Sequence, residues 1–146
     1  MNDFVEIRIL NAIRRLLTGR VNEILQETQF SIPLVEFGKY SGGSTVVPVV
    51  SLSTCERSEK ERIIRLDAYS LTITFSLMDT PESELFCYAY SAAVCIAIGE
   101  NPTLGGVAER VIISGKKYLP PKNPNSGEGW GVALSLRITV EVNNAG

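Results

Sequence analysis

Hydrophobic and polar side chains alternate along two long stretches of the chain. From Tyr69 to Leu77, apolar side chains occupy every second position and Ser or Thr side chains lie between them. The stretch from Val132 to Val142 alternates in the same way. A period of two is typical of strands that bury one face and leave the other in solvent. The sequence therefore predicts two long strands, residues 62–78 and 132–142, in a mostly antiparallel sheet.

The N-terminal region has the periodicity of a helix. Asp3 and Glu6 form a capping pattern, and Gly19 marks a place where the helix can break. These features predict a helix over residues 4–25. Its apolar positions are Leu10, Ile13, Leu17, Val21 and Ile24.

A second helix is predicted over residues 82–98. Asp79, Thr80 and Pro81 supply its start signal, and Gly99 ends it. Almost every position is apolar, so the helix must be covered on all sides. Two covers are consistent with the sequence: the chain's own sheet and first helix, or partly a neighbouring subunit. The Ser and Thr face of the strand 62–78 fits the ordinary strand preference of Thr, with a subunit contact as the alternative.

Shorter elements complete the pattern. Strands are predicted at residues 32–37, 46–52 and 107–113, with an interruption at 114–117. Residues 55–61 are predicted to be a charged connection, and residues 119–129 a long exposed loop rich in Pro and Gly. No repeat or linker divides the chain. The prediction is a single α+β domain over residues 1–146, a mostly antiparallel sheet packed with two main helices.

Composition excludes several classes of protein. Of 146 residues, 45% are apolar, which excludes a disordered or low-complexity chain. The net charge of −2 provides no overall positive field to attract nucleic acid. The sequence contains no histidine, which removes His-based catalytic triads and His metal sites. No signal peptide and no membrane helix are expected, since no apolar run reaches about 20 residues.

Candidate chemistry is sparse. Three cysteines without CxxC spacing predict neither a disulfide framework nor a zinc site, and free thiols fit a reducing cytoplasm. The glycines of Ser41–Ser44 are followed by Thr45 and a strand-like run rather than by Gly-Lys-Ser/Thr, which rejects a phosphate-binding loop. Without histidine, Cys87 and Cys95 are expected to be structural thiols. We expect no catalytic site, metal or cofactor.

The chain order of these elements resembles a known family. The relevant segments are Ile9–Ile13 in the first helix, the strand at Val46–Val50, the alternating Leu71–Phe75, the helix start at Pro81–Glu82, and the closing strand. The most specific feature is the Asn-Pro-Thr-Leu-Gly-Gly turn at residues 101–106. This layout, over nearly the whole chain, resembles tail-terminator and minor-tail proteins of tailed bacteriophages and prophages.

The resemblance implies a structural protein of the virion tail, assembled in the bacterial host cytoplasm, with no enzyme activity. A homo-oligomer, a hexameric ring, would cap the tail tube, end its polymerisation and provide a docking surface for a head-completion or connector protein. The partners implied are therefore copies of the chain, the tail-tube protein and that connector, with no nucleic-acid specificity and no membrane.

The candidate interface residues are mainly charged. We expect a run at residues 56–62 to contact the tube or a neighbouring subunit, or else to be a solvated hairpin. Trp130 is expected to be a loop anchor or an interface residue. The full set is Glu56, Arg57, Glu59, Lys60, Glu61, Arg62, Lys116, Lys117 and Trp130.

Two alternatives remain. One is a head–tail connector, neck or tail-completion protein, which the same fold would serve. The other is a cytoplasmic α+β protein, either an enzyme or a small-ligand module, which needs an apolar pocket with a few convergent polar groups. Its nearest candidate residues are Tyr40, Arg65, Asp67 and Trp130, and no spacing joins them.

Overall fold

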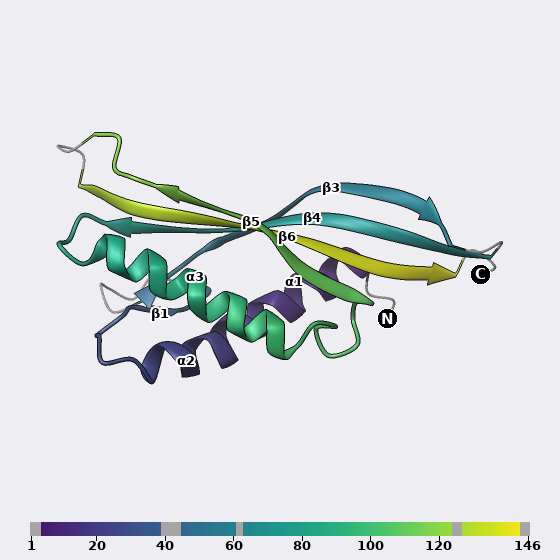
Figure 1. Cartoon of the computed structure of the whole chain (residues 1–146), viewed down its shortest axis with the longest axis horizontal. Helices are drawn as coiled ribbons and strands as arrows, with labels where there is room; N and C mark the ends of the chain where they lie inside the picture. The colour runs from purple at the N-terminus through teal and green to yellow at the C-terminus, as the bar shows by residue number, and fades with distance from the viewer. Residues whose placement is uncertain (1–3, 39–44, 61–62, 124–126, 144–146) are drawn as a thin grey trace.

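A computed structural model describes residues 4–38, 45–60, 63–123 and 127–143. Four strands form an antiparallel sheet in the order β3-β4-β6-β5. Their bounds are Val49–Glu59 for β3, Ile64–Met78 for β4, Arg110–Leu119 for β5 and Glu128–Asn143 for β6. A separate parallel pair joins β1, Leu34–Val35, to β2, Thr45–Val46. With helices on this sheet, the predicted α+β fold class is confirmed (Figure 1).

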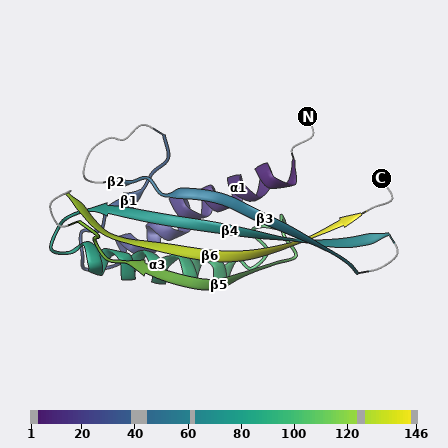
Figure 2. The ribbon, with the colours of Figure 1, turned by 90° about the horizontal axis from the view of Figure 1, so that it is seen from above.

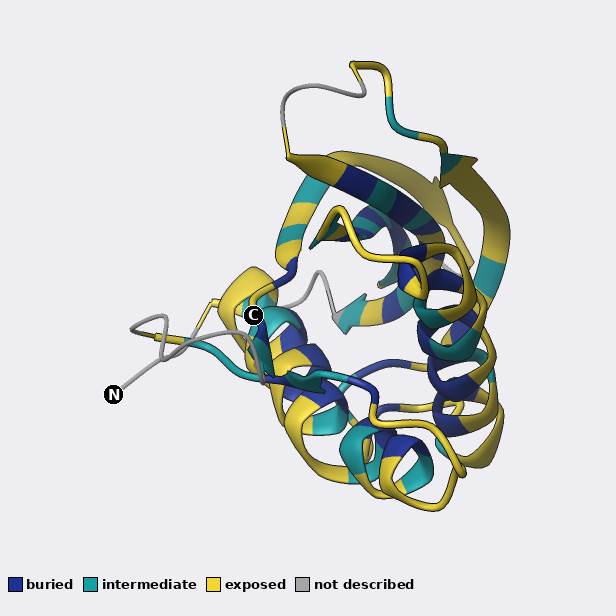
Figure 3. Cartoon of the chain, turned by 90° about the vertical axis from the view of Figure 1, so that its left-hand side faces the viewer, coloured by how far each residue is buried: buried dark blue, intermediate teal, exposed yellow. Residues whose placement is uncertain are grey.

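The helices cover one face of the sheet (Figures 1 and 3). α3, Ser83–Glu100, packs on β5 and β6, whereas α1, Val5–Leu16, lies on the β3 side (Figure 2). The strand faces are those the alternation predicts. The side chains that the sheet buries against the helices include Leu71, Ile73, Phe75, Val132, Leu134, Leu136, Ile138 and Val140. Among the described residues, no helix is long and apolar enough to cross a membrane.

The first helical segment contains one wide turn. α1 continues into a π-helical turn, η1, at Leu17–Val21, and then into α2, Asn22–Gln26. The predicted break near Gly19 is this turn. The buried positions are four residues apart, so Leu10 and Ile24 of the predicted apolar face are only partly buried. A four-residue step overshoots a full α-helical turn by about 40°. The wider turn offsets part of that drift and keeps one face on the core: Ile9, Ile13, Leu17, Val21 and Leu25.

Several predicted boundaries are wrong. Residues 55–59 are not a connection but the second half of β3, and Lys60 donates its N–H to Ile64 O in the turn to β4. This hairpin extends past the helices, so neither face needs to be apolar and the alternation is lost (Figure 1). The predicted strand at 32–37 is reduced to β1. Pro48, which has no N–H, separates β2 from β3. Asp3 lies outside the described residues.

The strand β5 also differs from its prediction. It begins at Arg110 rather than at residue 107 and runs through residues 114–117 without interruption. Its register with β6 shifts between Ile113 and Gly115, leaving Ser114 as the extra residue. A polar run and a glycine had suggested an end to the strand, but a β-bulge accommodates both within a continuous strand.

Candidate protein–protein interface

Both outer strands of the four-stranded sheet have an open edge in the described part of the chain. β3 pairs there only with β4, and β5 only with β6 (Figure 2). Because all three pairings are antiparallel, β3 and β5 run in opposite directions. Unpaired backbone N–H and C=O groups along an edge are a template for a further strand. A second copy in the same orientation can therefore place its β3 antiparallel to this β5.

Each edge strand contains one β-bulge. The register of β3 shifts between Leu52 and Thr54, which leaves Ser53 as the extra residue. The Ser53 hydroxyl donates a hydrogen bond to Ser70 O at 3.3 Å. On the other edge, the Ser114 hydroxyl donates to Ser135 O at 3.1 Å. Each bulged serine is thus tied to the inner strand next to it, which fixes the local twist of its edge.

The solvent side of α3 carries an apolar stripe. Its residues, three or four positions apart, are Leu85, Tyr88, Ala92 and Ile96. Tyr88 is 45% exposed and Ile96 is 47% exposed. The opposite side of the helix, including Tyr90 and Val94, is fully buried against the sheet and first helix (Figure 3). The chain's own core therefore covers most of this largely apolar helix and leaves the stripe uncovered.

Aromatic contacts connect this stripe to β5. The rings of Tyr88 and Tyr118 meet edge to face with centroids 5.3 Å apart. Tyr118 donates its hydroxyl hydrogen to Ser91 Oγ at 3.1 Å, and Tyr88 donates to Glu84 Oε2 at 2.6 Å. The bond to Glu84 raises the pKa of Tyr88, because it stabilises the protonated phenol. The stripe and the edge of β5 thus form one continuous surface.

Most predicted interface charges lie on the β3–β4 hairpin and have partners within the chain. Arg137 Nη2 lies 3.7 Å from Glu56 Oε2, and Arg57 Nε lies 3.7 Å from Asp67 Oδ1. Asp67 is buried, with only 3% of its surface exposed. Glu59 is exposed at the end of β3. Cross-strand ion pairs therefore engage Glu56 and Arg57 on the surface of the hairpin.

The turn of the hairpin is also charged. Lys60 Nζ lies 3.5 Å from Glu109 Oε1 and 3.6 Å from Glu141 Oε2. The two carboxylates raise the pKa of Lys60 through their charge. Glu61 and Arg62 lie outside the described residues. These ion pairs hold the tip of the hairpin against the ends of β5 and β6.

The remaining predicted residues lie elsewhere. Lys116 and Lys117 are exposed in β5, opposite Leu134 and Ala133 of β6. Trp130 is partly buried in β6, where its backbone N–H lies 3.4 Å from Ser83 Oγ. Its side chain packs against the core. The structure thus places the two lysines on an open edge, apart from the hairpin charges.

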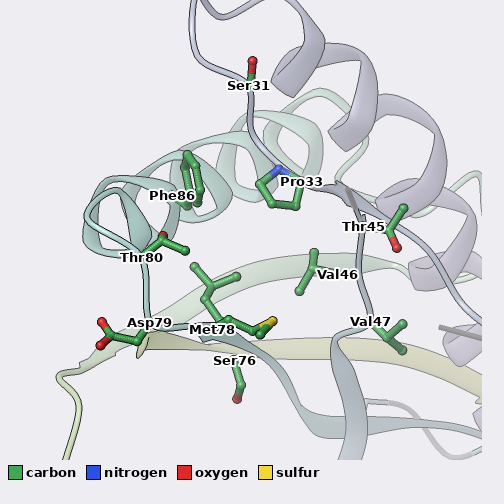
Figure 4. Close-up of a pocket in the computed structure, with 11 residues that line it drawn as sticks. Ser31, Pro33, Thr45, Val46, Val47, Ser76, Met78, Asp79, Thr80 and Phe86 are labelled. Carbon is green, nitrogen blue, oxygen red and sulfur yellow. The ribbon is translucent and has the colours of Figure 1, made fainter. Parts of the chain in front are cut away.

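A cavity of about 450 Å³ lies between β2, the end of β4 and the start of α3 (Figure 4). Its lining is mainly apolar and includes Val46, Met78 and Phe86. Thr45 Oγ1 is buried there and has no hydrogen-bond partner within the described structure. Sequence reasoning missed this cavity because the lining comes from segments far apart in the chain.

The residues proposed from the sequence for a small-ligand pocket do not come together. Arg65 and Asp67 form an ion pair of 3.1 Å on β4 toward the hairpin, and neither lines the cavity. Trp130 lies toward the opposite end of the sheet, and Tyr40 is outside the described residues. The three candidates that the structure describes therefore do not line one pocket.

The thiols and acids offer little reactive chemistry. Cys55 is exposed, Cys95 is partly buried and Cys87 is buried. Burial, with a smaller contribution from Glu84, raises the pKa of Cys87 to about 11, so its thiolate is rare at neutral pH. Among the residues with described positions, no three His, Cys, Asp or Glu side chains form a group that could hold a metal ion.

Comparison of the sequence with protein-family models and with curated proteins finds no match. Function is therefore inferred from the geometry of the chain itself. The apolar stripe on α3 and the two open edges are its main surface features. The sequence signal was the nearly all-apolar composition of α3, which indicated a need for cover without marking the positions that stay exposed.

Proposed function

We propose that the protein is a structural subunit of a bacteriophage or prophage tail, of the tail-terminator kind. Copies of the chain form a ring, a hexamer by resemblance to that family, which caps the tail tube and ends its polymerisation. The other side of the ring presents a docking surface to a head-completion or connector protein. The subunit acts by assembly and not by catalysis, in the host cytoplasm and then in the virion tail.

One observation carries this proposal. The two open edges of the sheet run in opposite directions, so copies in the same orientation can join head to tail. Contacts of this kind use two different surfaces of each subunit, and they close into a ring when the rotation between neighbours permits. The exposed stripe on α3 adds apolar surface beside one of these edges.

The hairpin is the proposed contact with the tube or the lining of the lumen. It extends past the helices and carries both signs of charge (Figure 1). Charges at the rim of an interface mainly set the register and the choice of partner.

Absolute mass in solution tests the assembly directly. Light scattering after size exclusion, over a wide range of concentration and with and without purified tail tubes, is expected to give a species near six times 16.0 kDa. Electron microscopy of tubes mixed with the protein is expected to show rings at tube ends and a halt in elongation. A protein that remains monomeric under all these conditions would contradict the proposal.

A head–tail connector or neck protein is the alternative within the same setting. The two roles differ in the partner that the ring binds. Binding to purified connectors but not to tube ends would favour this alternative. A tight dimer that does not change with concentration would also favour it over a terminator ring.

A second candidate function follows from the cavity. A volume of about 450 Å³ falls in the range of small-molecule sites, and Thr45 Oγ1 provides one unpaired polar atom. A fluorescent apolar dye such as anilinonaphthalene sulfonate is the first probe. Dye binding that Phe86→Trp removes, because the larger ring fills the cavity, would support a small-ligand protein. Equal binding by both proteins would argue against it.

A further inference from the structure

The open edges of β3 and β5 match each other in length and register. One row across the sheet joins Glu56, Ala68, Thr139 and Arg110, from β3 through β4 and β6 to β5. A second row joins Val49, Thr74, Ala133 and Lys117 in the same order. These rows define the segments of the two edges that a neighbouring strand would meet.

Between the two rows, each edge strand contains one more residue than the inner strands. The inner segments are 68–74 and 133–139, whereas the edge segments are 49–56 and 110–117. The additional residues are the bulged Ser53 and Ser114. A regular strand placed on either edge would lose register at the bulge. The two bulges flank one row, that of Leu52 and Ile113, on opposite sides. A strand with its own extra residue between the same two rows keeps both rows aligned, and the opposite edge of a second copy is such a strand.

From these matched bulges we infer that β5 of one copy pairs antiparallel with β3 of the next, with Arg110 opposite Glu56 and Lys117 opposite Val49. This inference rests on the proposed function, because it takes the neighbour to be a second copy in the same orientation. The bulges then make strand pairing selective, because they hinder pairing with unrelated strands and permit pairing with a second copy of this chain.

The charges on the two edges agree with this register. Arg110 and Glu56 carry opposite charge, lie on the same face of the sheet and are both exposed. Glu56 already lies 3.7 Å from Arg137 on its own chain. In the proposed pairing, this carboxylate lies between two guanidinium groups from different copies. Complementary charges of this kind select the register and the partner.

The helix layer continues across the same boundary. α3 lies on the β5 side and α1 on the β3 side, so the next copy brings its α1 beside this α3 (Figure 2). Tyr69 donates a hydrogen bond to Glu6, which fixes the first turn of α1 near the row that contains Tyr69 and Val111. Val111 N–H bonds Pro102 O, which places the C-terminal end of α3 near the same row. The C-terminal end of α3 therefore lies near the row at which the first turn of the neighbour's α1 would stand.

A charge exchange tests the register on the full chain. Arg110→Glu and Glu56→Arg are each expected to weaken self-association about tenfold, and the double variant E56R/R110E is expected to recover most of that loss. Arg137→Gln is the matched control, since it removes the partner of Glu56 within the chain and leaves both edges unchanged. Association is measured by sedimentation velocity, and circular dichroism reports whether each variant folds.

Cysteine cross-linking gives a second measurement. Within one copy, residues 49 and 117 lie on opposite edges, about 14 Å apart across three strand spacings, too far for a disulfide. In a Cys55→Ser background, V49C/K117C is expected to form a ladder of covalent oligomers on oxidation, with far less product from either single variant. Efficient cross-linking requires the two edges to meet.

The outcomes separate this inference from the proposed function. If the unmodified protein assembles, but the charge variants assemble equally well and no ladder forms, the pairing of β5 with β3 is wrong while assembly stands. If the unmodified protein remains monomeric both alone and with tail tubes, the proposed function and this inference both fail.

Discussion

Phe75 of β4 and Tyr90 of α3 stack face to face, with ring centroids 4.5 Å apart and planes 2° apart. Both side chains are fully buried. Tyr90 also donates its hydroxyl hydrogen to the carbonyl oxygen of Pro33. This one side chain therefore connects the sheet, the long helix and the segment that leads into β1.

The two roles of Tyr90 can be separated by mutation. Tyr90→Phe keeps the stacked rings and loses one hydrogen bond, so we expect a loss of about 1 kcal/mol in the free energy of unfolding. Phe75→Ala removes a buried ring and leaves a cavity, for which about 3–5 kcal/mol is expected. Urea unfolding measures both values, with the exposed Ser135→Ala as control. Equal losses of unfolding free energy from the two variants would contradict the view that the stacked rings contribute more than the hydrogen bond.

The hydrogen bond from Tyr69 to Glu6 Oε2, 2.8 Å long, predicts a dependence on pH. It lowers the pKa of Glu6 below 4.5, the ordinary value, since it favours the ionised carboxylate. The resulting stabilisation is complete above pH 4.5 and is lost as the pH falls through the lowered pKa of the folded state. Tyr69→Phe is therefore expected to cost less than about 1 kcal/mol at pH 7, because the carboxylate is exposed, and still less at pH 3.

Urea unfolding of the two proteins at pH 7 and pH 3 gives this comparison. The difference in free energy between them should narrow at the lower pH. A difference that stays constant from pH 7 to pH 3 would show that the ionised form of Glu6 contributes nothing through this bond.

Two glycines provide a matched pair of substitutions. A Cβ on Gly129 would lie 2.4 Å from Met78 O, so the backbone must shift. We expect Gly129→Ala to destabilise the fold by about 3 kcal/mol. A Cβ on Gly19 meets no atom within 4 Å, and this residue lies in a helical segment. Gly19→Ala is expected to stabilise by up to about 1 kcal/mol. Thermal unfolding would show midpoint shifts of opposite sign, and shifts of the same sign would refute the close-contact argument.

Neutralising the hairpin tests its proposed contact with the tail tube. The variant R57Q/K60Q is expected to lose tube capping while it keeps its fold, since Asp67 retains its ion pair with Arg65. The control variant R8Q/R15Q removes the same charge from the exposed side of α1. Capping is measured as the length distribution of tubes in electron micrographs. Normal capping by R57Q/K60Q would remove the hairpin from the contact.

Sequence patterns predict elements where burial imposes a period. The alternation in β4 and β6 gave the correct inward faces, because the helices cover one face of these strands along most of their length. The pattern failed at residues 55–59, where both faces meet solvent and no apolar side is required. It also failed at Ser114, because a bulge keeps a strand continuous through residues typical of a turn.

The candidate site was less predictable than the fold. The largely apolar composition of α3 indicated a surface in need of cover, but only packing shows which positions stay exposed. The matched rows from Glu56 to Arg110 depend on three strand registers, which the sequence does not encode locally. The cavity beside Thr45 depends on side chains from separate segments, so no local pattern could indicate it.

The topology of the sheet also sets an order of events during folding. β3 and β4 are joined by a short turn, so this hairpin can form early and locally. The pairing of β4 with β6 must wait until the chain from Asp79 to Gly127 closes into a loop, which carries a larger entropic cost. Until β6 pairs with it, β4 exposes to solvent its apolar face and the edge that later bonds β6. The slowest and most aggregation-prone stage of folding should therefore lie between formation of the β3–β4 hairpin and the pairing of β6 with β4.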